Sequence, residues 1–269
     1  MVFEGETGYI PEVDASLKRV VEQLDAIAEV GYLWPQGLLN PGGPHRRIKG
    51  HRFPISIGED ECLVFGKLVE AFRPGHCFII GNAFGFSSTY IADVMKRYGG
   101  QSVVTLDNQS EGGGQYMASI AQQLGDKLGL NEILRNKKGT SPQDIAAAAQ
   151  RESYDLVFID GLHRHPQVTR DFQGILSYTD ARSVVVFHDS WIVGVPEAVQ
   201  KAKKEGFRCL WIPTSCEMIL ATRDGARFGR LQELFKDGVE NRGRRGYAYG
   251  YSLYLRELFS FYFNRMLGR

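Results

Sequence analysis

Short apolar runs alternate with helix-length segments from Glu59 to Arg223, and this alternation constrains the fold more than any other feature of the chain. Runs such as CFII, VVTL and VVVF are short and continuously apolar, as buried strands are. Strands that alternate with helices form βαβ units, in which the strands are parallel and the helices cover both faces of the sheet. The pattern predicts an α/β chain with a doubly wound, mainly parallel, Rossmann-like sheet.

The expected sheet has seven strands, at residues 77–80, 102–106, 132–135, 154–160, 183–189, 207–213 and 216–223. Helices are expected between them, at residues 61–72, 87–98, 115–128, 142–150, 165–179 and 195–206. The link between the last two strands is short, and strands joined by a short link pair in the antiparallel direction. We therefore expect the sheet to end in an antiparallel C-terminal edge.

The alternating region is flanked by two segments of different composition, which predicts three parts. Residues 1–58 contain a predicted helix at 14–30 and a Pro/Gly-rich loop with basic residues from Arg46 to Arg52. This part is expected to be a lid or a substrate region, although the loop could equally be a solvated connector. Residues 59–223 form the sheet domain, and residues 224–269 form a C-terminal tail that ends in an aromatic helix. The tail is expected to pack on the domain or to form a homo-oligomer.

Composition and charge exclude several classes of protein. The formal net charge is +1, so no global basic field points to nucleic acid. The four cysteines form no CxxC pair and no zinc-like spacing. The N-terminus lacks the basic start and apolar core of a signal peptide, and no apolar window is long enough to cross a membrane. We therefore expect a cytoplasmic protein.

A glycine turn follows the first predicted strand and has the pattern G-x-x-x-G-x-S. A dinucleotide fingerprint requires G-x-G-x-x-G, whose second glycine lets the backbone approach a pyrophosphate. Here Ala83 stands two residues after Gly81, and the next glycine is Gly85. Asp107, at the end of the second strand, is placed to accept hydrogen bonds from ribose hydroxyls. A ribose site without a pyrophosphate site indicates an adenosyl ligand such as S-adenosylmethionine.

Four stretches carry a specific resemblance: FIIGNAFGFSSTYIAD, VVTLDN, YDLVFIDGLHRHPQVTRDF and SVVVFHDSWIVGVPEAV. In this order and spacing the chain resembles class I S-adenosylmethionine-dependent methyltransferases. It is most similar to the branch that includes catechol O-methyltransferase-like enzymes and bacterial methyltransferases of sugars and natural products. The resemblance extends over about residues 59–223.

The resemblance implies a set of residues that bind the cofactor. The methionine end would contact Gly81, Asn82, Gly85 and Ser87. The ribose would lie against Asp107 with Asn108 beside it, and the adenine would neighbour Gly139, Thr140 and Ser141. Asp160 would lie near the methionine ammonium.

One residue departs from the pattern of the catechol-type relatives. They usually carry a glutamate two residues before the first glycine, where this chain has Ile79. One anionic partner of the cofactor is therefore missing.

The resemblance also implies how a hydroxyl would lose its proton. Catechol-type enzymes carry a lysine three residues after the acid that ends the fourth strand, and His163 stands at that position here. An imidazole has an unperturbed pKa of about 6.5, which suits a general base at neutral pH. His165 is the second candidate for the general base. The alternative is that the histidine of this loop only orders the turn and takes no part in catalysis.

Metal-dependent relatives bind a divalent ion at the ends of the fourth and fifth strands. The corresponding residues here are Asp160, His188 and Asp189. Mg²⁺ prefers oxygen ligands, so His188 would suit a softer ion better. Without a metal, Asp189 could orient His163 or bind a substrate hydroxyl directly.

The predicted function is O-methylation of a small hydroxylated molecule, with sugars or secondary metabolites favoured. Substrate contacts are expected from the basic loop, from the loop with Trp191, and from the segment near Arg244 and Tyr247. Two alternatives remain open: a non-catalytic adenosyl-binding or scaffold protein, and a nicotinamide oxidoreductase.

Overall fold

The computed structural model describes residues 11–27, 56–109, 114–192, 194–214, 216–236 and 238. The basic loop from Arg46 to Arg52, the segment near Arg244 and Tyr247, and the predicted aromatic helix lie outside the described residues. No described helix is both long enough and apolar enough to cross a membrane.

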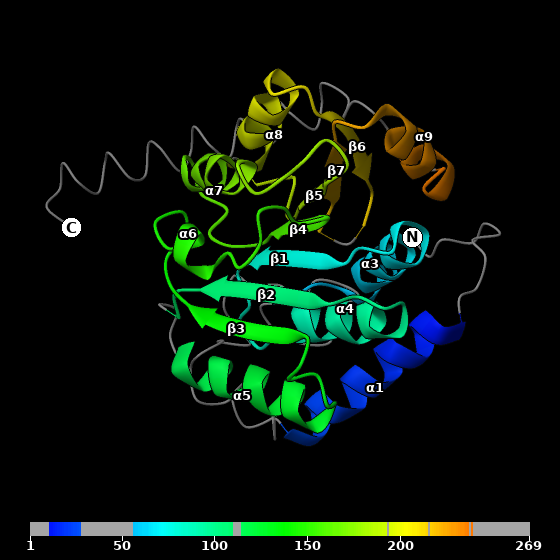
Figure 1. The fold of residues 1–269 in the computed structure, drawn as a ribbon, viewed down its shortest axis with the longest axis vertical. Coiled ribbons are helices and arrows are strands. Elements are labelled where there is room, and N and C mark those ends of the chain that lie inside the picture. The colour runs from blue at the N-terminus through cyan, green and yellow to red at the C-terminus, as the bar shows by residue number, and fades with distance from the viewer. Residues whose placement is uncertain are drawn as a thin grey trace, which may run out of the picture.

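The described chain forms a sheet with helices on both of its faces (Figure 1). The strands are β1 (His76–Ile80), β2 (Ser102–Asp107), β3 (Leu134–Lys138), β4 (Leu156–Ile159), β5 (Val184–Phe187), β6 (Arg208–Ile212) and β7 (Met218–Thr222). The helices are α1 (Pro11–Ile27), α3 (Glu59–Phe72), α4 (Phe86–Arg97), α5 (Gly114–Lys127), α6 (Ile145–Ala148), α7 (Gln167–Leu176), α8 (Gly194–Lys204) and α9 (Gly225–Leu234).

The seven strands lie in the order β3-β2-β1-β4-β5-β7-β6. Strands β1 to β5 pair in parallel, and β7 pairs in the antiparallel direction with both β5 and β6. The predicted α/β class, the mainly parallel sheet and the antiparallel C-terminal edge are therefore confirmed. The strand order reverses between β1 and β4, and ligands of doubly wound sheets bind beside the carboxyl ends of strands at such a point.

Alternating side chains of the strands, apart from those of the edge strand β3, pack into two separate cores. In β1, Cys77 and Ile79 join the core that also contains residues of α1, α3, α4, α5 and α9. Phe78 and Ile80 join the core on the opposite face, which contains residues of α6, α7 and α8. Because described helices cover both faces of the central strands, we expect a ligand to bind at the strand ends and the loops after them.

Some helix boundaries differ from those predicted. The helix expected at residues 142–150 is the single turn α6, because Thr140 and Asp144 close a preceding turn: the Thr140 N–H donates to Asp144 Oδ2 at 2.7 Å. Helix α1 begins at Pro11 and packs across α4 and α5. Helix α9 was not predicted as a separate element, and it packs on β6 and β7.

Candidate functional site

The turn after β1 brings the ends of β1 and β4 into backbone contact. Gly81 has φ +90°, and a Cβ built on it would lie 2.1 Å from the carbonyl oxygen of Asp160. Gly85 has φ +77°, and its Cβ would lie 2.6 Å from the Cβ of Ala121 on α5. Left-handed backbone and close approach both favour glycine, so the sequence G-x-x-x-G sets the shape of this turn.

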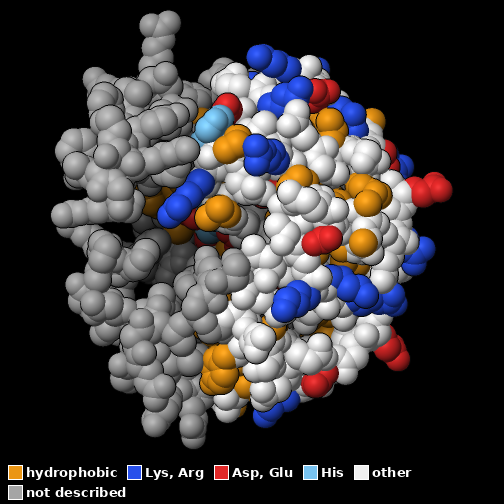
Figure 2. All heavy atoms as spheres, turned by 90° about the vertical axis from the view of Figure 1, so that its left-hand side faces the viewer, with side chains coloured by type: hydrophobic (Ala, Val, Ile, Leu, Met, Phe, Trp, Pro, Cys, Tyr) orange, Lys and Arg blue, Asp and Glu red, His pale blue; other side chains and the backbone are white. Residues whose placement is uncertain are grey.

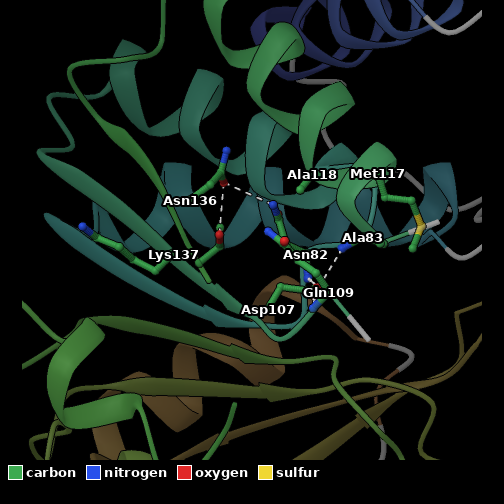
Figure 3. A pocket seen from close by; sticks show the side chains of 10 residues that line it. Asn82, Ala83, Asp107, Gln109, Met117, Ala118, Asn136 and Lys137 are labelled. Carbon is green, nitrogen blue, oxygen red and sulfur yellow. Dashed lines mark hydrogen bonds between the residues drawn. The ribbon is translucent and has the colours of Figure 1, made fainter. Parts of the chain in front are cut away.

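Asp107 holds this turn from the end of β2 (Figure 3). Its Oδ2 accepts the backbone N–H groups of Asn82 at 2.8 Å and Ala83 at 3.1 Å, and its Oδ1 accepts that of Gln109 at 2.7 Å. A carboxylate has about four lone-pair sites, so one site is still available to a ribose hydroxyl. The residue predicted to bind ribose is thus also the residue that orders the glycine turn.

A pocket lies beside this turn, between the ends of β2 and β3 and the start of α5 (Figure 3). The amide of Asn82 faces it, donates to Asn136 Oδ1 at 3.1 Å, and accepts from the Ser88 hydroxyl at 2.6 Å. The hydroxyl that bonds to the turn belongs to Ser88, the neighbour of Ser87, which stays a predicted cofactor contact. Ser87 is buried in the first turn of α4, and Asn108 follows Asp107 directly.

The loop after β3 is attached both to β2 and to α7. The N–H of Gly139 donates to the carbonyl oxygen of Asp107 at 3.0 Å. The hydroxyl of Ser141 donates to Asp171 Oδ1 at 2.6 Å, and Gln167 Nε2 donates to the same oxygen at 2.6 Å. Burial raises the pKa of the Asp171 carboxyl, and these hydrogen bonds oppose that effect. Gly139, Thr140 and Ser141 therefore lie in an ordered loop next to the end of β2.

His163 lies between two carboxylates at the ends of β4 and β5. Its Nε2 is 3.4 Å from Asp160 Oδ1, and its Nδ1 is 3.3 Å from Asp189 Oδ2. Asp189 has φ +52°, a left-handed conformation that a non-glycine residue rarely adopts and that is enriched at functional sites. His165, the substitute base, instead pairs with Glu197 of α8. The structure thus brings together His163, Asp160 and Asp189 but not His165.

His188 occupies the buried side of the same cluster. Its Nδ1 is 2.8 Å from Asp160 Oδ1 and 3.6 Å from Asp189 Oδ2, and its Nε2 is 3.0 Å from Glu61 Oε2. Burial alone would lower the pKa of His188, but the charges of Asp160 and Glu61 raise it well above its usual value. Burial alone would likewise raise the pKa of Asp160, but His188 and His163 hold it well below its usual range.

The predicted metal ligands Asp160, His188 and Asp189 lie together, and the geometry adds His163 to them. Ligand atoms of Asp160, His163 and His188 lie within 4.8 Å of one another. Within the described part of the chain, the buried atoms His163 Nε2 and His188 Nδ1 make no aligned hydrogen bond. Two imidazoles and a carboxylate fit a borderline ion such as Zn²⁺ better than Mg²⁺, and binding would displace any proton on these nitrogens.

Sequence reasoning missed Glu61, which is fully buried although it belongs to the first turn of α3. Its position in the sequence is typical of a capping residue, and its Oε2 does accept the N–H of Gly58 at 2.8 Å. Nothing in the local pattern indicates that the same carboxylate also reaches His188.

Comparison with known proteins agrees with this geometry. A family model described as a methyltransferase domain matches residues 78–190, which include the predicted catalytic, cofactor-binding and metal-binding residues. No curated protein matches the chain.

Several solved structures share the fold. An O-methyltransferase from Bacillus cereus in complex with S-adenosylhomocysteine is 18% identical with a TM-score of 0.55, over 80% of this chain and 93% of that one. A putative caffeoyl-CoA O-methyltransferase from Staphylococcus aureus is 13% identical with a TM-score of 0.56, over 78% of this chain and 100% of that one. The O-methyltransferase TomG from Streptomyces achromogenes, involved in tomaymycin synthesis and crystallised with S-adenosylmethionine, is 13% identical with a TM-score of 0.53, over 81% and 91% of the two chains.

The strand order and the glycine turn with its acid agree with the family match: residues 78–190 are similar to a methyltransferase domain.

Proposed function

We propose that the protein transfers a methyl group from S-adenosylmethionine to a hydroxyl of a small molecule, with His163 as the general base. The single observation that carries this proposal is the place of His163, whose two ring nitrogens lie 3.4 Å and 3.3 Å from Asp160 and Asp189. The cluster adjoins the glycine turn, because Gly81 contacts the backbone of Asp160. A base is therefore held at the strand ends, where the cofactor of this fold class binds.

The substrate class we favour is a sugar or a secondary metabolite. Structural neighbours that are named for caffeoyl-CoA methylation and for tomaymycin synthesis support a small hydroxylated acceptor. Figure 2 faces the carboxyl edge of the sheet, where the described Lys and Arg side chains are scattered among apolar and acidic ones. This distribution suits a small molecule better than a polyanion.

The residues of the chain would divide the work as follows. Asp107 and the turn from Gly81 to Gly85 hold the adenosyl group, which supplies the methyl as a sulfonium when it is bound. Asp160 lies beside the turn and provides negative charge for the methionine ammonium. His163 accepts the proton of the acceptor hydroxyl, and Asp189 orients the ring through Nδ1. Orientation and proton removal are the two tasks that an in-line methyl transfer leaves to the protein.

A divalent ion at Asp160, His188 and Asp189 would polarise the acceptor hydroxyl and lower its pKa. The two carboxylates of this set suit Mg²⁺ or Mn²⁺, whereas the imidazole of His188 suits Zn²⁺ better. An ion that also took His163 as a ligand would remove the base, so the two roles of His163 exclude each other.

Calorimetric titration with S-adenosylhomocysteine, and separately with NAD, tests the cofactor, and an acceptor screen with and without metals follows. His163→Ala is expected to lower kcat by about 10²- to 10⁴-fold with unchanged affinity for S-adenosylhomocysteine, because only proton removal is lost. His165→Ala is the matched control and should keep wild-type kcat. Binding of NAD alone would refute the proposal. S-Adenosylhomocysteine binding without transfer to any acceptor would favour the non-catalytic alternative, for which Ile79 is the main argument.

A further inference from the structure

We propose that Glu61 is a positioning residue for this site: it fixes the ring of His188, so that Nδ1 of that ring faces Asp160. The proposal rests on the proposed role of His163, because Asp160 also contacts that base. Glu61 lies outside the segment matched by the methyltransferase family model, which begins at residue 78.

The carboxylate of Glu61 is surrounded by donors. Oε1 accepts the hydroxyl of Thr214 at 2.9 Å and the N–H of Cys216 at 3.2 Å. Oε2 accepts the N–H of Gly58 at 2.8 Å and contacts His188 Nε2 at 3.0 Å. The side chain of Glu61 is completely buried, so no water competes for these oxygens.

Gly58, Thr214 and Cys216 already donate to the two oxygens of Glu61, so these oxygens act as acceptors and the His188 nitrogen 3.0 Å away acts as a donor. Glu61 therefore holds a proton on Nε2 and directs Nδ1 toward Asp160 Oδ1, 2.8 Å away. Asp160 Oδ1 in turn lies 3.4 Å from His163 Nε2. The contacts run from buried Glu61 through His188 and Asp160 to the proposed base. The same orientation would present Nδ1 to a metal ion.

The neighbouring side chains allow the His188 ring little freedom. The ring packs edge-on against Phe158, with centroids 6.0 Å apart, and Phe158 packs against Phe65 of α3 with centroids 4.7 Å apart. Phe65 lies one helical turn after Glu61, so α3 supplies both the carboxylate and the side chain that packs against Phe158. Packing restricts the plane of the ring, and Glu61 decides which nitrogen faces the strand ends.

Glu61→Gln tests the proposal, with Thr214→Val as the matched control. A glutamine offers one acceptor and one donor group where four donors converge, so the contact with His188 either loses its charge or meets an NH₂ group. We expect kcat to fall by about 10- to 100-fold, the effect of losing one hydrogen bond to a charged group. Affinity for S-adenosylhomocysteine should stay unchanged. Thr214→Val also removes a buried bond to Glu61 but leaves the His188 contact, so it should lower stability and keep kcat.

The ¹⁵N spectrum of histidine-labelled protein provides a readout that needs no acceptor, and His188→Asn identifies the signal of His188. The wild type should show a hydrogen on Nε2, and Glu61→Gln should shift that signal while Thr214→Val does not. An unprotonated Nε2 in the wild type would overturn the proposal, whether or not the variants fold. So would a Glu61→Gln variant that loses only stability, since Glu61 would then be no more than a helix cap. An inactive wild type with the expected spectrum would contradict the methyltransferase activity and leave the role of Glu61 in place.

Discussion

Replacing Gly81 with alanine tests how closely the ends of β1 and β4 must approach. A Cβ at this position would lie 2.1 Å from the carbonyl oxygen and 2.7 Å from the carbonyl carbon of Asp160, and neither atom can rotate away. Left-handed backbone costs an L-residue about 1–2 kcal/mol, and overpacking costs about 1–3 kcal/mol. The variant should therefore lose about 2–5 kcal/mol of unfolding free energy.

Gly99→Ala is the matched control for this variant. Gly99 has φ +82°, close to the +90° of Gly81, but a Cβ there would meet nothing within 4 Å. The Gly99→Ala variant should therefore lose only the free energy that the left-handed backbone costs an alanine, about 1–2 kcal/mol of unfolding free energy. The difference between the two variants isolates the steric clash.

Urea unfolding with linear extrapolation measures both losses, and calorimetry measures the affinity for S-adenosylhomocysteine. Gly81→Ala should weaken binding, because relief of the clash moves the glycine turn away from Asp160. Gly99→Ala should bind as the wild type does. Equal losses of stability in the two variants would refute the close approach of β1 and β4, and unchanged binding in Gly81→Ala would refute the role of the turn.

Two further predictions concern stability. Burial raises the pKa of Asp171 in the folded state, so the wild type loses stability as the pH rises from the unfolded-state value of about 3.9 through the folded-state value. Asp171→Asn keeps an acceptor for the Ser141 hydroxyl but carries no charge. In urea unfolding, the variant should therefore have a larger unfolding free energy than the wild type at about pH 7, and this difference should disappear near pH 4. Arg19 Nη2 donates to both oxygens of buried Asp93 at 2.7 Å and 2.5 Å, so Arg19→Ala should cost about 1–3 kcal/mol. Lys18→Ala removes only an exposed pair and should cost at most about 0.5 kcal/mol; equal losses would contradict this assignment.

The ends of several strands could be predicted from the sequence because two signals coincide there. A continuous apolar run ends, and a polar residue follows at once, as with Asp107, Asp160 and His188. Parallel strands end at the same edge, so these residues were expected to converge before any contact was known. The place of β7 inside the sheet was not predictable in this way. A short link pairs β6 with β7, but it does not say which of the two lies beside β5.

The contacts of α3 with the candidate site could not be predicted from the sequence, for a different reason. Glu61 is one acid in a helix whose first turn also contains Glu59 and Asp60, and acids there are ordinary helix-start residues. What distinguishes Glu61 is its burial beneath the end of β5, which depends on contacts with residues more than a hundred positions away in the chain. Local sequence patterns carry no information on such pairings.

The packing around Ile79 explains why an apolar residue stands at this position. Ile79 is fully buried, pairs with Phe158 on the next strand, and lies in the core that α3 covers. A glutamate there, as in catechol-type relatives, would need a partner, because an unpaired buried carboxylate is costly. On this face the buried carboxylate comes from Glu61 of α3, and it bonds to His188 rather than to the glycine turn. The buried carboxylate of Glu61 thus lies against His188, which in turn contacts Asp160 at the end of β4.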